Sequence, residues 1–252
     1  MKADNAMKPM QQTRRIFLQT TAAAAATVAL GALPFTARAQ TTTSGKMKIG
    51  IVGSGRVGSA LGGAWVRAGH DVMFSSLNLE QDKKLAASLG PNAHAGTPRE
   101  AAVFGTVLLI AVPYSAMPSV SKDLADLIKG KIIIDPSNPL PRDGDVGVAA
   151  REKGAGLASM EYLPGARIVR AFNAVGAARM AEAAGRSERM GMPIAGDDQN
   201  AIATASNLIR DVGYEPVLVG SLAAMGKHLI PGTPLAGERS PEQIRQIAAT
   251  LK

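Results

Sequence analysis

The chain has 252 residues, carries a formal net charge of +8 and contains no cysteine. The absence of cysteine excludes disulfides, iron–sulfur clusters, thiol catalysis and cysteine-based zinc sites. Half of the net charge lies in the first 39 residues, and the rest of the chain has no long run of Lys and Arg. We therefore expect no nucleic-acid partner, and the residues suggest no metal site.

The N-terminal segment has the features of an export signal. Arg14 and Arg15 stand directly before an apolar triplet at 16–18, which is typical of the twin-arginine route. An alanine-rich stretch and a small-x-small cleavage site ending at Ala39 follow. We expect residues 1–39 to be a signal peptide that engages the twin-arginine export machinery. Cleavage near Ala39 would release a periplasmic protein with no stable membrane anchor, because threonines interrupt the apolar stretch.

Residues 40–46 are small and polar, and we expect them to form a flexible linker. The expected fold occupies residues 47–252. It begins with a strand at 47–53, a helix with apolar spacing at 56–69 and a second strand at 70–74. This order predicts a βαβ unit.

The alternation of strands and helices continues along the chain. Thr97 and Pro98 predict the N-cap and the first residue of a helix. Further strands are expected at 106–112, 131–135, 166–172, 189–196 and 214–220. Further helices are expected at 79–90, after 117, at 176–185 and at 198–212, with a loop at 136–147. The pattern predicts an α/β, Rossmann-like, doubly wound fold with a mostly parallel sheet and a small C-terminal helical addition. A substrate and dimer portion is expected from about residue 160.

The segment GSGRVG has three glycines in G-x-G-x-x-G spacing between the first strand and the first helix. In that context the first glycine makes the turn, the second lets the backbone approach a pyrophosphate, and the third lets the helix pack closely. The alternative is a tight turn with no ligand. The predicted cofactor-binding loop comprises Gly53, Ser54, Gly55, Arg56, Val57 and Gly58.

The segment FSSLN at 74–78 ends the second expected strand, where a dinucleotide-binding fold contacts the adenosine ribose. An NAD site has a carboxylate there, and this segment has none, so we predict NADP (NADPH) as the cofactor. Ser75, Ser76 and Asn78 are expected to contact the 2′-phosphate. Two lysines in the next helix are interpreted as its solvated face.

Three later strands end in turns with polar residues or proline, at LLIAVPY (108–114), IIDPSNPLP (133–141) and AFNAVG (171–176). Because the carboxyl ends of parallel strands meet at one edge of a sheet, these turns predict a pocket. Ordinary turn chemistry is the alternative for each of them. The cofactor side is predicted to include Ala111, Val112, Pro113 and Asn138. The substrate side is predicted to include Tyr114, Pro139, Phe172 and Asn173.

Together, the segments IGIVGSGRVG, LLIAVPY, IIDPSNP, VRAFNAVG, MPIAGDD and AGERSPEQIRQ resemble the F420-dependent NADP oxidoreductase family over residues 47–252. The resemblance implies a commonly dimeric protein in which hydride passes between NADPH and a deazaflavin. Two features depart from the family. Leu77 stands where relatives often carry arginine, which weakens the expected hold on a 2′-phosphate. An export signal is the other, since free NADPH and deazaflavin are cytoplasmic molecules.

These observations predict an NADP-dependent oxidoreductase that transfers hydride between the nicotinamide and a deazaflavin, a flavin or another small acceptor. Two alternatives remain open: a non-catalytic NAD(P)-binding or redox-sensing module, and an imine or keto reductase. No side chain is predicted to be catalytic, because hydride transfer requires orientation and exclusion of water rather than a nucleophile. His70 is interpreted as structural, and His228 is the histidine that the chain could bring to the pocket mouth.

Overall fold

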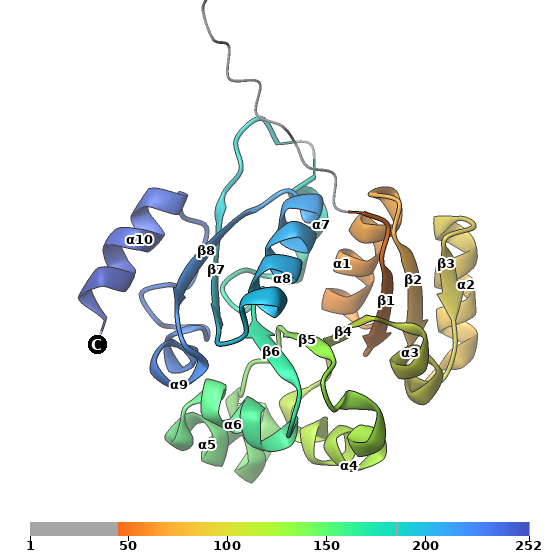
Figure 1. The fold of residues 1–252 in the computed structure, drawn as a ribbon, viewed down its shortest axis with the longest axis horizontal. Helices are drawn as coiled ribbons and strands as arrows, with labels where there is room; N and C mark the ends of the chain where they lie inside the picture. The colour runs from red at the N-terminus through yellow and green to blue at the C-terminus, as the bar shows by residue number, and fades with distance from the viewer. Residues whose placement is uncertain (1–44, 185, 252) are drawn as a thin grey trace, which may run out of the picture. The chain divides into compact units, whose positions relative to one another are not determined.

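An eight-stranded sheet in the order β3-β2-β1-β4-β5-β6-β7-β8 organises the residues that this computed structural model describes, 45–184 and 186–251 (Figure 1). The strands are β1 (Lys48–Val52), β2 (Asp71–Ser75), β3 (Ala93–Ala95), β4 (Val107–Ile110), β5 (Ile132–Asp135), β6 (Arg167–Arg170), β7 (Gly191–Gly196) and β8 (Glu215–Gly220). Strands β1 to β6 pair in parallel, β6 pairs with β7 antiparallel, and β7 pairs with β8 in parallel. The predicted Rossmann-like, mostly parallel sheet is confirmed.

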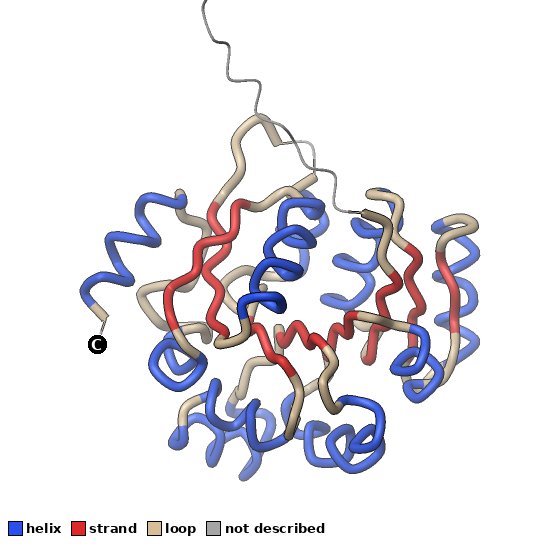
Figure 2. Tube along the Cα trace, in the orientation of Figure 1, coloured by secondary structure: helices blue, strands red, loops and turns tan. Residues whose placement is uncertain are grey.

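Helices lie on both faces of the sheet (Figure 2). One face packs against α1 (Arg56–Arg67), α2 (Leu79–Leu89), α7 (Ala177–Glu182) and α8 (Gln199–Val212). The other face packs against α3 (Pro98–Phe104), α4 (Met117–Ile128), α5 (Gly144–Lys153), α6 (Ala155–Tyr162), α9 (Leu222–Met225) and α10 (Pro241–Thr250). Three short 3-10 turns are η1 (Tyr114–Ala116), η2 (Pro141–Asp143) and η3 (Gly226–His228).

Central strands supply both cores because successive side chains point to opposite faces. In β4, Val107 and Leu109 belong to the first core, while Leu108 and Ile110 belong to the second, and all four are buried. This explains why the sequence of the strand is a continuous apolar run rather than an alternating one.

Local capping signals determine several helix starts. The Thr97 side chain accepts a hydrogen bond from the Glu100 amide, the Glu100 carboxylate accepts from the Thr97 amide, and Pro98 opens α3. The predicted cap is therefore confirmed as a capping box. Asn78 caps α2 in a similar way, by accepting from the Gln81 amide.

Two parts of the fold differ from the sequence-based expectation. The short strand β3 was not predicted, and the expected loop at 136–147 contains η2 and the first turn of α5. The prediction of a mostly parallel sheet did not specify which strand departs from the parallel order. That strand is β7, which follows α7 and runs antiparallel to β6.

Two side chains tie the first βα unit to α8, far along the chain. The Trp65 indole Nε1 donates to the Leu208 carbonyl oxygen at 2.9 Å. His70 Nδ1 accepts from the Met47 amide at 3.1 Å, so its Nε2 carries the proton and donates to Asp211 Oδ2 at 2.9 Å. His70 therefore has the structural role expected for it.

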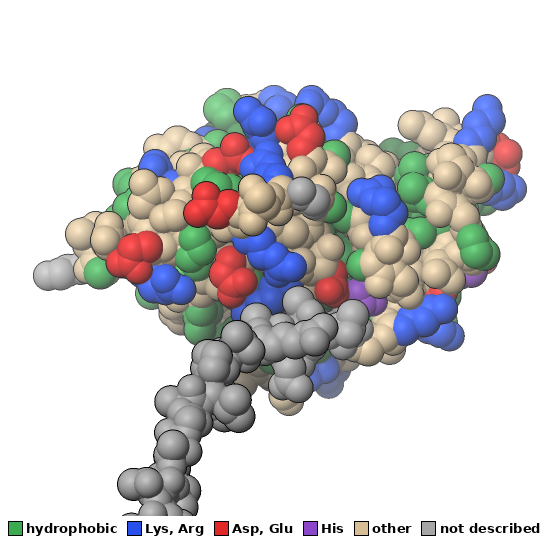
Figure 3. Space-filling model, turned by 90° about the horizontal axis from the view of Figure 1, so that it is seen from above, with side chains coloured by type: hydrophobic (Ala, Val, Ile, Leu, Met, Phe, Trp, Pro, Cys, Tyr) green, Lys and Arg blue, Asp and Glu red, His purple; other side chains and the backbone are tan. Residues whose placement is uncertain are grey.

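The predicted signal peptide, residues 1–39, lies outside the described residues, as does most of the predicted linker. Within the part of the chain that the structure describes, no helix has the length and hydropathy of a membrane span. On the face drawn in Figure 3, Lys and Arg side chains are interspersed with Asp and Glu side chains, so that face presents no patch of a single charge sign.

Candidate functional site

Two adjoining cavities lie along the carboxyl edge of the parallel strands, each of about 500 Å³. The β2-side cavity is lined by Val52, Gly53, Gly55, Ser76, Leu77, Asn78, Pro98, Ala111, Val112, Pro113, Ala116, Ser119, Val120, Asp123 and Leu124. The β5-side cavity is lined by Gly55, Arg56, Val57, Ala111, Val112, Pro113, Tyr114, Pro136, Ser137, Asn138, Leu140, Arg142, Asp143, Gly176 and Ala177. Four residues line both cavities, so together they form one elongated groove. A two-part ligand with a bridge over the first glycine-rich turn suits this shape.

The glycine loop is shaped by close backbone contacts. Gly53 has a φ of +100°, and a Cβ on Gly58 would lie 2.1 Å from the Gly53 carbonyl oxygen. A Cβ on Gly55 would meet no atom within 4 Å, because this residue faces the open groove. The backbone amides of Gly53 and Ser54 both donate to the Ser75 carbonyl at 2.9 Å, which fixes the loop against the end of β2.

The N-terminus of α1 opens onto the groove. No side chain caps it, as is also true of α4, α5, α6 and α7, whereas the other helices described begin with a side-chain cap. Uncapped amide groups and the helix dipole attract an anion, and both cavities reach Gly55 at this point. The open space at Gly55 and the uncapped helix therefore fit the pyrophosphate of a dinucleotide.

The two serines at the end of β2 have different surroundings. Ser75 is fully buried, and its hydroxyl donates to the Ile51 carbonyl at 2.6 Å. The prediction that Ser75 contacts the cofactor is therefore corrected, because its side chain points into the sheet. Ser76 lines the β2-side cavity, as does Asn78, whose side-chain oxygen is already used to cap α2.

FSSLN itself contains no acid, but a carboxylate from α2 contacts its Ser76. Asp82, on the first turn of α2 and fully buried, accepts hydrogen bonds from the hydroxyls of Ser54 and Ser76. The distance from Ser76 Oγ to Asp82 Oδ2 is 2.8 Å. Asp82 was not predicted as a site residue, because it stands in a polar helical segment with no local sign of burial.

The β5-side cavity is bounded by residues that later strands provide. Asn138 Nδ2 donates to the Asn173 carbonyl at 3.1 Å, and the Asn173 amide group donates to the Ser137 carbonyl at 3.2 Å. The Tyr114 ring lines the cavity and packs edge-on against Tyr162, with ring centroids 6.1 Å apart. Burial, with Asp135 nearby, raises the pKa of the Tyr114 hydroxyl well above its ordinary value, so the side chain stays neutral.

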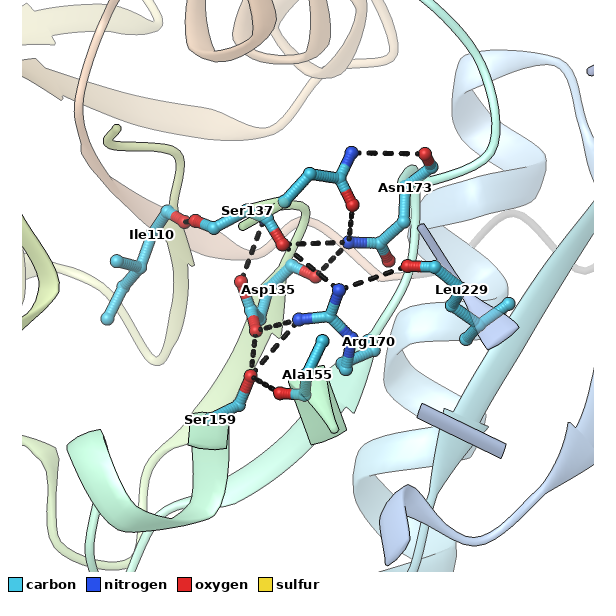
Figure 4. Close-up of polar contacts among 9 residues, drawn as sticks. Ile110, Asp135, Ser137, Ala155, Ser159, Arg170, Asn173 and Leu229 are labelled. Carbon is cyan, nitrogen blue, oxygen red and sulfur yellow. Dashed lines mark hydrogen bonds and ion pairs between the residues drawn. The ribbon is translucent and has the colours of Figure 1, made fainter. Parts of the chain in front are cut away.

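A buried ion pair lies behind this cavity (Figure 4). Arg170 Nη1 donates to Asp135 Oδ2 at 2.7 Å, and neither side chain has exposed surface. Arg170 Nη2 donates to the carbonyl oxygens of Ser137, at 3.0 Å, and Leu229, at 3.1 Å. The pair thus joins the turn after β5 to the segment after η3.

Three residues predicted on the substrate side do not line either cavity. Phe172 is buried in the core, where its ring makes edge-on contacts with Trp65 and Tyr214. Its φ of +65° turns the side chain away from the groove at the end of β6. Asn173 is buried and supports the cavity wall through the hydrogen bonds described above, and Pro139 is also buried. These placements correct the prediction that the three contact the substrate.

Sequence reasoning missed the residues that η2 and α7 bring to the cavity. Arg142 lines it from η2, Arg56 of the glycine loop also lines it, and neither guanidinium forms an ion pair with another described residue. Both carboxylate oxygens of Asp143 accept backbone amides, from Ser115 at 3.2 Å and Leu140 at 2.8 Å. Asp143 is therefore a structural cap, and the cavity has a net positive rim.

No acid–base pair is present in the lining that would mark a catalytic centre, and His228, in η3, is not among the residues that line either cavity. Within the described ranges, no group of three or more His, Cys, Asp and Glu side chains is arranged to hold a metal ion.

Part of the groove lies in a segment that matches a known protein family. Residues 48–139 match the family described as "NADP oxidoreductase coenzyme F420-dependent". The matched segment runs from β1 to the turn after β5, and therefore includes the glycine loop, Asp82 and the turn with Asn138.

The three individual proteins compared next share between 20% and 32% sequence identity with this chain. The chain is 32% identical over 181 residues to metalloreductase STEAP3 of Rattus norvegicus, covering 70% of this chain but only 34% of that protein. Our chain thus spans about a third of the length of that curated relative. A solved structure of a hypothetical protein from Sinorhizobium meliloti aligns with a TM-score of 0.65 and 26% identity over 75% of this chain and 93% of that one.

Another solved structure, from Arthrobacter sp. and described as a candidate F420-dependent NADP reductase, has a TM-score of 0.59 and 20% identity. The alignment covers 73% of this chain and 90% of that one. At this identity the likeness shows the shared fold.

Proposed function

We propose that this chain is an oxidoreductase that binds a nicotinamide dinucleotide and transfers hydride to or from a small acceptor beside it. The observation that carries the proposal is the elongated groove, whose two cavities meet at the uncapped N-terminus of α1. The family match over residues 48–139 supports it, because that segment contains all the residues that line the β2-side cavity.

Different residues of the groove would bind different parts of the dinucleotide. Gly55 and the first amides of α1 would hold the pyrophosphate, with the Arg56 guanidinium adding positive charge. Ser76 and Asn78 would contact the adenosine end, and Asn138 would contact the nicotinamide end. The description of the matching family names NADP, and the preference of this groove for NADP or NAD depends on the residues at its ribose end.

The nicotinamide, when bound, supplies or receives the hydride. The chain contributes orientation and exclusion of water, since the walls formed by Val112, Pro113 and Tyr114 are mostly apolar. Arg142 on the rim would attract an acceptor that carries an anionic group. Deazaflavins and flavins are flat acceptors of suitable size, and the family description names the deazaflavin coenzyme F420.

A non-catalytic nucleotide-binding or redox-sensing module is the second candidate. One observation favours it: the cavity carboxylate, Asp143, has both oxygens occupied by backbone amides and cannot exchange protons with an acceptor without breaking its cap. Reduction of a deazaflavin adds a hydride at a ring carbon and a proton at a ring nitrogen, and solvent can supply that proton. The contacts of Asp143 therefore exclude it as the proton donor but do not exclude hydride transfer.

Fluorescence titration with NADPH and NADH tests the proposal directly. We expect saturable binding of at least one of them, and failure of both to bind at high micromolar concentration would refute it. Hydride transfer is then measured with a deazaflavin, a flavin and simple carbonyl or imine compounds. Turnover with none of them, alongside tight nucleotide binding, would support the sensor.

We further propose that the protein is exported through the twin-arginine route, on the basis of Arg14, Arg15 and the cleavage site at Ala39. Replacing both arginines by lysine keeps the charge and is expected to leave precursor in the cytoplasm. The matched control is replacement of Lys2 and Lys8 by arginine. Unchanged periplasmic accumulation of the twin-lysine variant would contradict the proposal.

A further inference from the structure

The ribose end of the groove contains an arrangement that the proposed function does not explain. Ser54 follows β1 and Ser76 follows β2, and both hydroxyls donate to the same buried carboxylate, Asp82 of α2. In a fold of this topology, the junction after β1 and β2 is where the adenosine ribose binds.

The direction of these hydrogen bonds determines what the serines offer to a ligand. A serine hydroxyl has one proton to donate and two lone pairs that accept. Each hydroxyl donates its proton to a carboxylate oxygen of Asp82, which has no exposed surface. One lone pair of Ser76 accepts from the Asn78 amide at 3.0 Å. Toward the groove, the Ser76 hydroxyl, which lines the β2-side cavity, therefore presents its remaining oxygen lone pair.

The charges around the β2-side cavity also disfavour a phosphate group there. None of the described residues that line the β2-side cavity is Lys or Arg, while Asp123 lines it and Asp82 lies behind it. Lys83, which follows Asp82 in the chain, is paired with Glu80 at 2.8 Å on the exposed side of α2, and Arg56 lines the adjoining β5-side cavity. Leu77, fully exposed, adds an apolar side chain at the rim.

We propose that Asp82 is a specificity-determining residue that makes Ser54 and Ser76 acceptors, so that the groove binds the 2′-hydroxyl of NADH in preference to the 2′-phosphate of NADPH. A ribose hydroxyl in the β2-side cavity can donate to the Ser76 oxygen. A phosphate dianion has only acceptor oxygens, and here it meets lone pairs and a buried negative charge. Asp82 need not touch the ribose, because it acts through the two serines.

This inference rests on the proposed function, and the two are separated by one experiment on the whole protein. Dissociation constants for NADH and NADPH are measured by fluorescence titration at fixed ionic strength. We expect NADH to bind about tenfold more tightly than NADPH, because the ribose 2′-hydroxyl gains a hydrogen bond to a serine oxygen and the 2′-phosphate cannot form one. Binding of neither nucleotide would overturn the proposed function. Equal binding, or tighter binding of NADPH, would overturn the role of Asp82 and leave the proposed function standing.

Replacing Asp82 by asparagine provides the sharper test. The amide can donate to one serine oxygen, which frees that hydroxyl to donate outward, and the negative charge is lost. We expect the NADPH-to-NADH ratio of dissociation constants to fall about tenfold. Asp123→Asn removes a charge from the same cavity without contacting either serine, and we expect it to lower the ratio much less than Asp82→Asn does. Equal shifts in both variants would overturn the hydrogen-bond argument.

A variant that leaves Asp82 intact covers the case in which Asp82→Asn does not fold, as judged by circular dichroism. Ser76→Ala removes one acceptor and is expected to weaken NADH binding more than NADPH binding. An unchanged ratio in Ser76→Ala would refute the assignment.

Discussion

Replacing Arg170 by methionine removes the cation from a fully buried cluster. The substitution preserves much of the side-chain volume but leaves the Asp135 carboxylate with two donors, the Ser159 hydroxyl and the Ser137 amide. It also removes the donor from the carbonyl oxygens of Ser137 and Leu229. The effect should therefore be far larger than the loss of one surface ion pair.

The magnitude follows from the burial of the pair. Breaking a buried ion pair by removing one partner costs about 3–5 kcal/mol, because the remaining charge stays desolvated. The two donors that Asp135 retains reduce this, and the two carbonyls add about 1 kcal/mol each. We therefore expect the free energy of unfolding to fall by about 4 kcal/mol, with the melting temperature lower by roughly 8–16 °C.

Urea denaturation followed by circular dichroism measures the change. Arg167→Met is the matched control, because Arg167 lies in the same strand, is part-exposed and approaches Asp198 only at 4.0 Å. Its expected loss is below about 1 kcal/mol. The double variant Asp135→Asn/Arg170→Met should be more stable than Arg170→Met alone, since it removes the unpaired charge. A loss in Arg170→Met no larger than in Arg167→Met would refute the reasoning.

Three further predictions follow from the described contacts. Gly58→Ala should destabilise the protein by about 1–3 kcal/mol, because its Cβ would meet the Gly53 carbonyl. Gly55→Ala should leave the urea midpoint unchanged and still weaken nucleotide binding, because its Cβ meets open space in the groove. Equal urea midpoints for the two variants would contradict this. His70→Ala should lower stability by about 2–3 kcal/mol and leave nucleotide affinity unchanged, since both ring nitrogens bind structural partners; a large change in affinity would show a role in the groove. Burial raises the pKa of Tyr214 to about 12, so the unfolded chain loses this proton at lower pH than the folded protein does. The associated stabilisation is complete below about pH 10 and is lost as the pH rises through about 12. Tyr214→Phe should flatten this decline of the urea midpoint with pH, and an identical decline in the variant would argue against the reasoning.

Local signals in the sequence predicted the parts of the fold that depend on near neighbours. Thr97, Pro98 and Glu100 form a cap within four residues, and the glycine spacing depends on a turn only six residues long. The continuous apolar run of β4 predicted a strand buried on both faces. Each of these features is determined by contacts within one or two elements, which is why spacing alone revealed it.

Features that depend on distant contacts were not predictable in this way. Asp82 is buried because Ser54, 28 positions earlier, lies against it, and nothing in the segment LEQDKK distinguishes it from a solvated acid. Phe172 follows a strand like the groove residues, yet its positive φ directs the ring into the core. Arg142 reaches the cavity only because η2 and α5 replace the loop expected there.

The contacts between α1 and α8 bear on how the chain acquires its structure during synthesis. Trp65 and His70 are buried by Leu208 and Asp211, so about 140 residues must emerge after the first helix before its apolar stripe can be covered. The segment 48–139 therefore does not contain the partners that its own first helix needs, and a fragment ending there would expose Trp65 to solvent. We expect the nascent chain to depend on chaperones until residue 211 is available, and folding of the first strand to follow synthesis of nearly the whole protein.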